Sequence, residues 1–254
     1  MKKFKTVILI LLLISNAFTF SGCWNYREVE DLGIVIGAAI DKEDDKYTVT
    51  VESITSTIPN FSQAKTKTYS ASGHTIFDAV RNIVLKTGKK LFWSHAMVII
   101  LSPNVARSGV QKIIDWFLRD SEPRFTTWVM VSKTEKASDI FSLDVEGSDV
   151  ETSFDLNKIM ENYPLSYQFP EIDIRRFVTS VLSDDTSAVA PMVNLVTQNG
   201  KTDIEVSGAA VFKKDKMVGE LDKDSIKNFL FISQNIKDTL LPLKNVLNLN
   251  TDVT

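Results

Sequence analysis

The sequence predicts an α/β (mixed α+β) fold, with a mixed β-sheet and flanking helices in a first large domain and an incomplete second domain. Three observations support this prediction. The 254 residues are 44% hydrophobic and 24% charged, which is typical of a globular protein. Apolar, strand-like stretches alternate with helical patterns along the chain. The connections between them are short, which favours strand–helix–strand crossovers and therefore parallel strand pairs.

Residues 1–22 are predicted to form a lipoprotein signal peptide. Lys2, Lys3 and Lys5 precede the unbroken apolar run Val7–Ile14, and no acidic residue occurs before Glu28. A membrane-spanning helix needs about 20 apolar residues, and this run is shorter and is followed by polar residues. The pattern therefore indicates a secretory signal segment instead of a membrane span or a core helix.

Cys23 is the predicted lipid attachment site. It is the single cysteine of the chain and follows the small residues Ser21 and Gly22, which resembles a bacterial lipobox. Phe20 departs from that pattern, which prefers leucine at this position. In this interpretation the Cys23 thiol receives a diacylglyceryl group, the chain is cut before it, and the new amino group is acylated. The acyl chains then anchor the protein to a membrane without spanning it.

The mature chain is expected to open with a β-hairpin. Ile34–Ile40 is apolar, and Tyr47–Ile54 alternates apolar with polar residues, as in a half-buried strand. The charged segment Asp41–Lys46 lies between them. It is predicted to be a solvated turn, because Lys46 occupies the position at which a calcium-binding EF-hand loop needs glycine.

A strand–helix–strand segment is predicted next. Thr75 and Asp78 have the spacing of a helix capping box, and Gly88 is a typical helix end. The elements that follow are a strand at Met97–Leu101, a helix after Pro103 whose apolar face holds Val110, Ile113, Ile114, Phe117 and Leu118, and a strand at Thr126–Val131. Further helices are predicted at 137–143, 156–160 and 172–182, and further strands at 189–196 and 204–212.

The polar cluster Gln198–Lys201 is the predicted domain boundary. It separates a large domain, residues 23–200, from residues 201–254, the start of a second α/β domain in which 224–243 supplies one helix. A domain as short as the second segment is marginal on its own, and no cysteine or metal ligand set is present to stabilise it. We therefore expect the first domain to fold and the chain to fray beyond about Lys201.

The residues indicate no catalytic chemistry. The chain has no phosphate-binding glycine loop, zinc-protease motif or nucleophile elbow. His95 and His74 are candidate general bases, but neither has a nucleophile at a recognisable spacing. Arg119, Asp120, Glu122 and Arg124 are predicted to form an ion-paired loop instead of an anion site.

Binding to metals and nucleic acids is not expected either. One cysteine and two histidines argue against a Cys/His zinc site. A formal net charge of −3 without a basic run argues against a nucleic-acid surface. No cofactor is expected other than the covalent diacylglycerol and N-acyl lipid on Cys23.

Several motifs together resemble the Ger(x)C (GerAC-like) spore germination lipoproteins. Gly22–Gly33 is similar to their start, in which a lipid-modified cysteine precedes a W-x-x-R-E-[IV]-x-[DE]-L segment. Lys90–His95 with Val98–Ile100 matches the family's K-L-hydrophobic-x-x-H strand. Ser207–Lys213, followed by Lys216–Gly219, matches the hairpin that opens the second domain. The motifs occur in the family's order along most of the chain.

The resemblance implies a non-enzymatic C subunit of a nutrient germinant receptor. Such a subunit is anchored through Cys23 to the outer face of the spore inner membrane (cell membrane) of a spore-forming bacterium, with integral-membrane A and B subunits as partners. Members of the family have three domains, so a chain ending at Thr254 is expected to be truncated. Two alternatives stay open: a solute-binding lipoprotein of a transporter, and an envelope hydrolase that uses His95.

Overall fold

The computed structural model describes residues 3–8, 10, 31–54, 66–120, 122–142, 152–163, 167–233, 241–243 and 251–253. Contacts divide the chain into two units, Met1–Leu32 and Gly33–Thr254. In the first unit, residues 3–8 are helical and exposed. The second unit holds the sheet, its covering helices and both hydrophobic cores.

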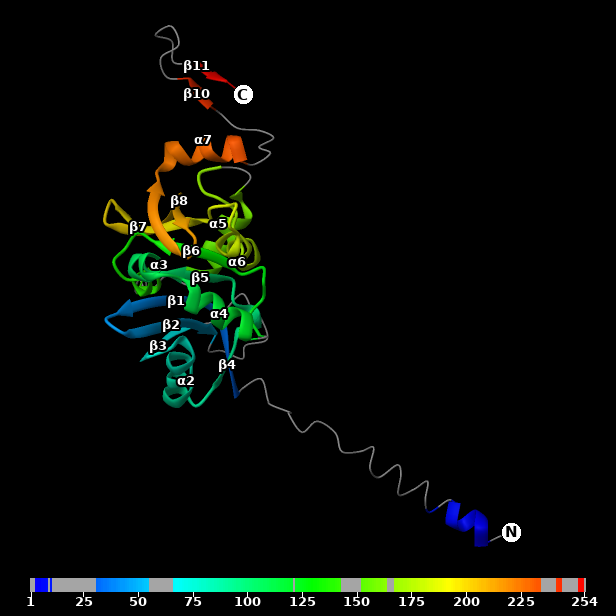
Figure 1. Cartoon of the computed structure of the whole chain (residues 1–254). Coiled ribbons are helices and arrows are strands. Elements are labelled where there is room, and N and C mark those ends of the chain that lie inside the picture. Colours follow the sequence, from blue (N-terminus) through cyan, green and yellow to red (C-terminus); the bar gives the residue numbers. More distant parts are fainter. Residues whose placement is uncertain are drawn as a thin grey trace. The chain divides into compact units, whose positions relative to one another are not determined.

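A nine-stranded mixed sheet forms the body of the second unit, with the order β3-β2-β1-β5-β6-β7-β8-β9 and β4 paired with β1 (Figure 1). The central strands β1, β5, β6 and β7 are parallel to one another, and the outer pairs are antiparallel. This mixed sheet confirms the predicted fold class. Its strands are β1 (Leu32–Glu43), β2 (Lys46–Ile54), β3 (Thr66–Gly73), β4 (Lys90–Phe92), β5 (Val98–Leu101), β6 (Trp128–Ser132), β7 (Val189–Gln198), β8 (Lys201–Lys213) and β9 (Lys216–Leu221). The short strands β10 (Leu241–Leu243) and β11 (Thr251–Val253) form a separate antiparallel pair.

Helices cover both faces of the sheet. They are α2 (Ile76–Thr87), α3 (Pro103–Ser108), α4 (Gln111–Arg119), α5 (Thr152–Glu161), α6 (Ile174–Leu182), α7 (Lys223–Ser233) and the 3₁₀ helices η3 (Trp93–His95) and η4 (Ala137–Ser142). Ile99 and Leu101 of β5 belong to a core with α2, α3, α4 and α6. Val98 and Ile100 belong to a second core with η4, α5 and α7. All four residues are buried, as expected for a central parallel strand.

The helix predicted between Thr75 and Gly88 is confirmed. The Thr75 hydroxyl accepts the Asp78 N–H at 3.1 Å, and Gly88 ends α2 with a φ of 68°. The single helix predicted after Pro103 is wrong, because the chain breaks there into α3 and α4. Gly109 separates them with a φ of 117°, a conformation that favours glycine. Leu118, predicted on the apolar face, is 53% exposed.

The hairpin prediction is wrong at Asp41. Strand β1 continues to Glu43, only Asp44 and Asp45 form the turn, and Asp41 is buried. The Asp41 carboxylate accepts the backbone N–H groups of Ala137 at 2.7 Å and Ser138 at 3.1 Å. A charged residue was expected to be solvated, but the start of η4 covers it and supplies its hydrogen-bond donors.

Glu52 on β2 is also buried, and it binds the start of α5 as Asp41 binds the start of η4. Its carboxylate accepts the Ser153 N–H at 2.9 Å and the Ser153 hydroxyl. Burial raises the pKa of both Glu52 and Asp41, although the hydrogen bonds act in the opposite direction. Two neighbouring strands thus each use a buried carboxylate to hold the start of a segment that covers the sheet.

The polar cluster Gln198–Lys201 is the turn of the β7–β8 hairpin, so the sheet continues across the predicted domain boundary. Phe212 of β8 is fully buried, and its ring meets that of Phe177 in α6 edge to face at 5.2 Å. Ile226 and Leu230 of α7 are fully buried in the second core. The expectation that the chain frays beyond Lys201 is therefore wrong for residues 201–233. Their apolar side chains complete the core of the preceding residues and do not need one of their own.

Replacing Phe212 tests this shared core. We expect Phe212→Ala to lower the unfolding free energy of the whole body by about 3–5 kcal/mol in one urea transition, because a large buried ring is lost. The control Phe231→Ala removes a ring of α7 that is 55% exposed, and its effect should stay within about 0.5 kcal/mol. A separate early transition confined to the C-terminal residues would contradict a shared core.

The raised pKa of Glu52 predicts a pH dependence of stability. The folded state binds the Glu52 proton more tightly than the unfolded state does, so stability falls as pH rises from the ordinary glutamate pKa, about 4.3, through the folded value. Glu52→Gln should make this decline shallower in denaturant unfolding measured at a series of pH values. Glu43→Gln is the control, since Lys136 lowers the pKa of Glu43 and its contribution has the opposite sign. An unchanged slope in Glu52→Gln would refute the prediction.

Candidate functional site

The predicted lipid attachment site, Cys23, lies outside the described residues, so its acylation stays a prediction. Among the helices that the structure describes, none is both long and apolar enough to cross a membrane.

His95 lies at the end of η3, in the connection between β4 and β5, and is exposed. Its ring is 5.7 Å from that of Phe92. Within the described ranges, no hydroxyl or carboxylate forms a hydrogen bond with the His95 imidazole. His74, just before α2, is exposed as well. The described part of the chain also contains no cluster of three or more metal-ligating side chains. Among the described residues, the surroundings of His95 therefore supply no nucleophile–base pair for the hydrolase interpretation.

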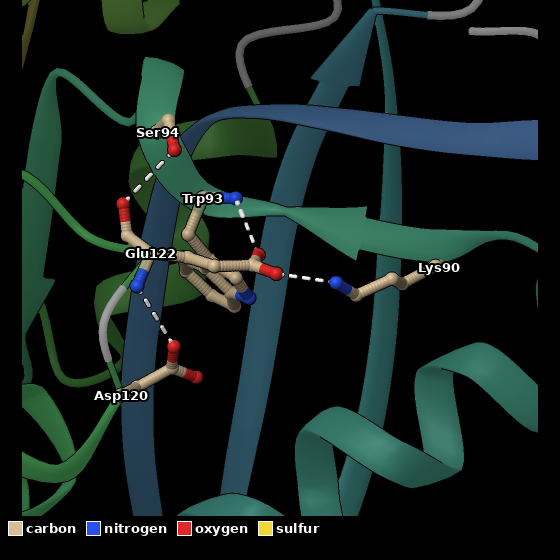
Figure 2. Close-up of polar contacts among 5 residues, drawn as sticks. All are labelled: Lys90, Trp93, Ser94, Asp120 and Glu122. Carbon is tan, nitrogen blue, oxygen red and sulfur yellow. Dashed lines mark hydrogen bonds and ion pairs between the residues drawn. The ribbon is translucent and has the colours of Figure 1, made fainter. Parts of the chain in front are cut away.

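Glu122 organises the segment that leads to His95 (Figure 2). One oxygen of its carboxylate forms an ion pair with the Lys90 ammonium, and the other accepts the Trp93 N–H at 3.5 Å. The backbone carbonyl of Glu122 accepts the Ser94 hydroxyl at 3.1 Å. Asp120 positions Glu122 in turn, because its carboxylate accepts the Glu122 N–H at 3.0 Å. A loop that follows α4 thus holds both β4 and η3.

Aromatic packing fixes the same segment from the core side. Trp93 is buried, and its ring meets that of Trp116 in α4 edge to face at 4.8 Å. The Trp116 ring lies 4.6 Å from that of Phe117. Aromatic pairs of this kind contribute about 0.5–1.5 kcal/mol beyond the burial of their area. The segment Lys90–His95 is therefore held by Glu122 on its polar side and by α4 on its apolar side.

The predicted ion-paired loop is only partly what the structure shows. Glu122 pairs with Lys90, which is remote in sequence, while Arg119 pairs with Asp115 one helical turn away at 3.1 Å. The Asp120 carboxylate accepts the backbone N–H of Glu122. The charged residues of the loop indicated that ion pairs form there. The local sequence does not identify the partner of Glu122, however, because Lys90 lies on a separate element, β4.

Comparison with protein families identifies the chain's relatives. The family model for the spore germination protein N-terminal domain matches residues 25–195, which is most of the chain. The chain belongs to the GerAC-like family of spore germination proteins. The GerAC-like C-terminal model matches residues 207–250 in addition. The resemblance inferred from the Lys90–His95 and Ser207–Lys213 motifs is thereby confirmed.

Curated relatives of this GerAC-like protein are spore germination proteins, which supports a role in germination. YfkR of Bacillus subtilis (strain 168) is 29% identical over 84% of this chain and 58% of its own length. Spore germination protein A3 of the same organism is 27% identical over 93% of this chain and 63% of its own length. Spore germination protein KC, also of Bacillus subtilis (strain 168), is 24% identical over 82% of this chain and 56% of its own length. The chain thus spans about three fifths of the length of these relatives. No solved structure gives a significant match.

The two GerAC-like family models meet inside one sheet. The N-terminal model ends at residue 195, within β7, and the C-terminal model begins at residue 207, within β8. These two strands pair along the whole hairpin. Strands β8 and β9, with α7, therefore complete the body that the N-terminal residues begin.

The Glu122 cluster predicts a selective loss of stability. Glu122→Ala should lower the unfolding free energy by about 1–2 kcal/mol, since it leaves the Trp93 N–H and Lys90 without their acceptor. In Asp115→Ala, which removes the exposed pair with Arg119, the loss should be at most about 1 kcal/mol. Both values come from urea unfolding followed by tryptophan fluorescence. Equal losses in the two variants would show that Glu122 holds no more than a surface ion pair does.

Proposed function

We propose that this GerAC-like protein is a non-enzymatic, lipid-anchored C subunit of a spore nutrient germinant receptor. It acts in germination by assembling with, or stabilising, the integral-membrane A and B subunits. The observation that carries the proposal is the family match across residues 25–195, together with relatives named spore germination proteins A3, B3 and KC.

The anchor in this proposal is Cys23, behind the small residues Ser21 and Gly22. Each buried methylene of an acyl chain contributes about 0.8 kcal/mol, and two or more chains give stable attachment. The lipid would hold the folded body at the outer face of the spore inner membrane, beside the integral subunits. The short apolar run Val7–Ile14 fits a cleaved signal segment in this scheme.

The candidate site supports an assembly role better than a catalytic one. The Glu122 carboxylate is engaged with Lys90 and the Trp93 N–H, so it is committed to holding a surface segment in place. A surface segment that is already ordered loses little conformational entropy when a partner binds it. The solute-binding alternative calls for two lobes around a hinge. The nine-stranded sheet gives that alternative no support, because it runs from β3 to β9 without a division into two lobes.

Removing the cysteine tests the proposal directly. In sporulating cells, wild-type protein should carry lipid, fractionate with the spore inner membrane and co-purify with two multi-pass proteins. Cys23→Ala should be unacylated and should lose both properties. Ser21→Ala keeps a small residue before the cysteine and should behave as wild type. Mass spectrometry of the N-terminal peptide and affinity purification from membrane extracts are the measurements.

Two results would contradict the proposal. Wild-type protein found soluble and without lipid would refute the anchor. Acylated wild-type protein that co-purifies with no multi-pass protein would refute the subunit role while leaving the anchor intact.

A further inference from the structure

Exposed apolar side chains lie close to the Glu122 cluster, at the edge of the sheet where β1 begins. Leu118 lies in the last turn of α4, and Phe125 lies in the loop that leads from α4 to β6. Leu118 is 53% exposed and Phe125 is 56% exposed. Single exposed apolar residues are ordinary on a protein surface, but several on adjoining segments mark an interaction surface.

The end of α2 brings a third apolar residue to this edge. Leu85, in the last turn of α2, is 83% exposed. Gly88 ends the helix, and two residues later Lys90 of β4 forms its ion pair with Glu122 (Figure 2). The Glu122 carboxylate therefore joins the end of α2 and β4 to the loop that carries Phe125.

The first residues of β1 lie at the same edge. A Cβ atom on Gly33, the second residue of β1, would lie 3.3 Å from the Leu91 side chain and 3.8 Å from the Lys89 side chain. Strand β4 also pairs with β1. Residues 85–91, 118–120 and 122–125 form what we call the entry edge, because the chain enters the sheet beside them.

Uncompensated positive charge accompanies the apolar residues. Within the described residues, no carboxylate lies within ion-pair distance of the Lys89 ammonium or the Arg124 guanidinium. Lys90 and Arg119, by contrast, are already in ion pairs. An exposed acid, Asp31, lies just before β1 and opposes this charge in part. Lys89 and Arg124 are therefore available to attract anionic groups.

The predicted anchor places a bilayer within reach of the entry edge. Leu32, the first residue of β1, follows Cys23 by nine residues. An extended chain spans at most about 3.3–3.6 Å per residue, so β1 begins within about 30 Å of the acylated cysteine. Tethering over such a distance raises the effective concentration of the bilayer, so that contacts too weak for free association are still populated.

We propose that the entry edge lies against the lipid bilayer, with Leu118 and Phe125 among the headgroups and with Lys89 and Arg124 facing anionic headgroups. The proposal rests on the lipid anchor at Cys23 proposed above, and it adds the orientation in which the body is held. Apolar side chains that enter the interface and cations that attract anionic lipid both contribute to binding at a bilayer surface. The entry edge supplies both, beside the first strand after the anchor.

Fluorescent labels at single positions test this orientation. Cys23 is the single cysteine of the chain, so an introduced cysteine is the only free thiol of the acylated protein. The acylated protein with Phe125→Cys or Leu118→Cys would be labelled with a polarity-sensitive fluorophore and reconstituted in vesicles of phosphatidylcholine and phosphatidylglycerol. The emission of both labels should shift to shorter wavelength, and nitroxide-labelled lipid should quench it.

Two exposed positions outside the entry edge are matched controls. Phe231 in α7 is 55% exposed, and Val218 in β9 is 63% exposed. Labels on Phe231→Cys and Val218→Cys should keep the emission of a label in water, and nitroxide-labelled lipid should quench them several-fold less. Labels at residues 118 and 125 that stay in water, or equal quenching at all four positions, would overturn the proposal.

A charge variant tests the contact with anionic headgroups. In the labelled Phe125→Cys protein, Arg124→Gln should reduce quenching by the lipid, because one attraction to anionic headgroups is lost. Replacing the phosphatidylglycerol with phosphatidylcholine should have the same effect. Lys112→Gln is the control, since Lys112 is exposed in the first turn of α4, outside the entry edge. Equal quenching in Arg124→Gln and its parent would contradict the contact with anionic headgroups.

Failure of the anchor and failure of the orientation give different results. Mass spectrometry of the N-terminal peptide reports acylation in each sample, and a chain without lipid would contradict the anchor at Cys23. The same labelled variants would then carry Cys23→Ser and an N-terminal histidine tag, and vesicles with a nickel-chelating lipid would hold them. The labels at residues 118 and 125 report contact with lipid in either form, so the orientation is supported or overturned independently of acylation.

Discussion

The burial of β5 on both faces is the constraint on which the rest of this structure depends. Val98–Leu101 has no solvent-exposed side, so each face of the sheet needs its own layer of helices. The chain supplies α2, α3, α4 and α6 to one face and η4, α5 and α7 to the other. Because β1, β5 and β6 run in one direction, their first residues lie toward the same edge, where the Glu122 cluster joins β4 to the loop after α4.

Buried acids, as well as apolar packing, attach η4 and α5 to the face of the sheet that they cover. Asp41 and Glu52 lie on adjacent strands, and each binds backbone N–H groups at the start of a covering segment. Burying a carboxylate is costly unless its oxygens are satisfied. Asp41 and Glu52 meet this condition with N–H groups at the starts of η4 and α5. The buried acids and the segments that cover them therefore depend on each other.

Local sequence signals predicted the helices and strands that are determined by interactions between residues close in sequence. The Thr75 cap and Gly88 define α2, and the apolar runs of β5 and β6 define a parallel pair. Strand β3 escaped prediction because Ala71 and Gly73 are its only buried residues, and the backbone ladder to β2 holds it. The roles of Asp41 and Glu52 depend on partners 96 and 101 residues away. The Glu122 cluster has no contiguous motif, since separate segments of the chain assemble it.

The β7–β8 hairpin has a consequence for how members of this family can exchange parts. A recombination point placed between the two family models, at residues 195–207, would separate paired strands. The hybrid would then have to form the β7–β8 ladder and the core from two diverged sequences, with Phe212 of one parent facing Phe177 of the other. A crossover after α7 keeps the β7–β8 ladder and both described hydrophobic cores within one parent. The unit defined by packing is therefore longer than residues 25–195, the range of the N-terminal family model, and it includes α7, which ends at Ser233.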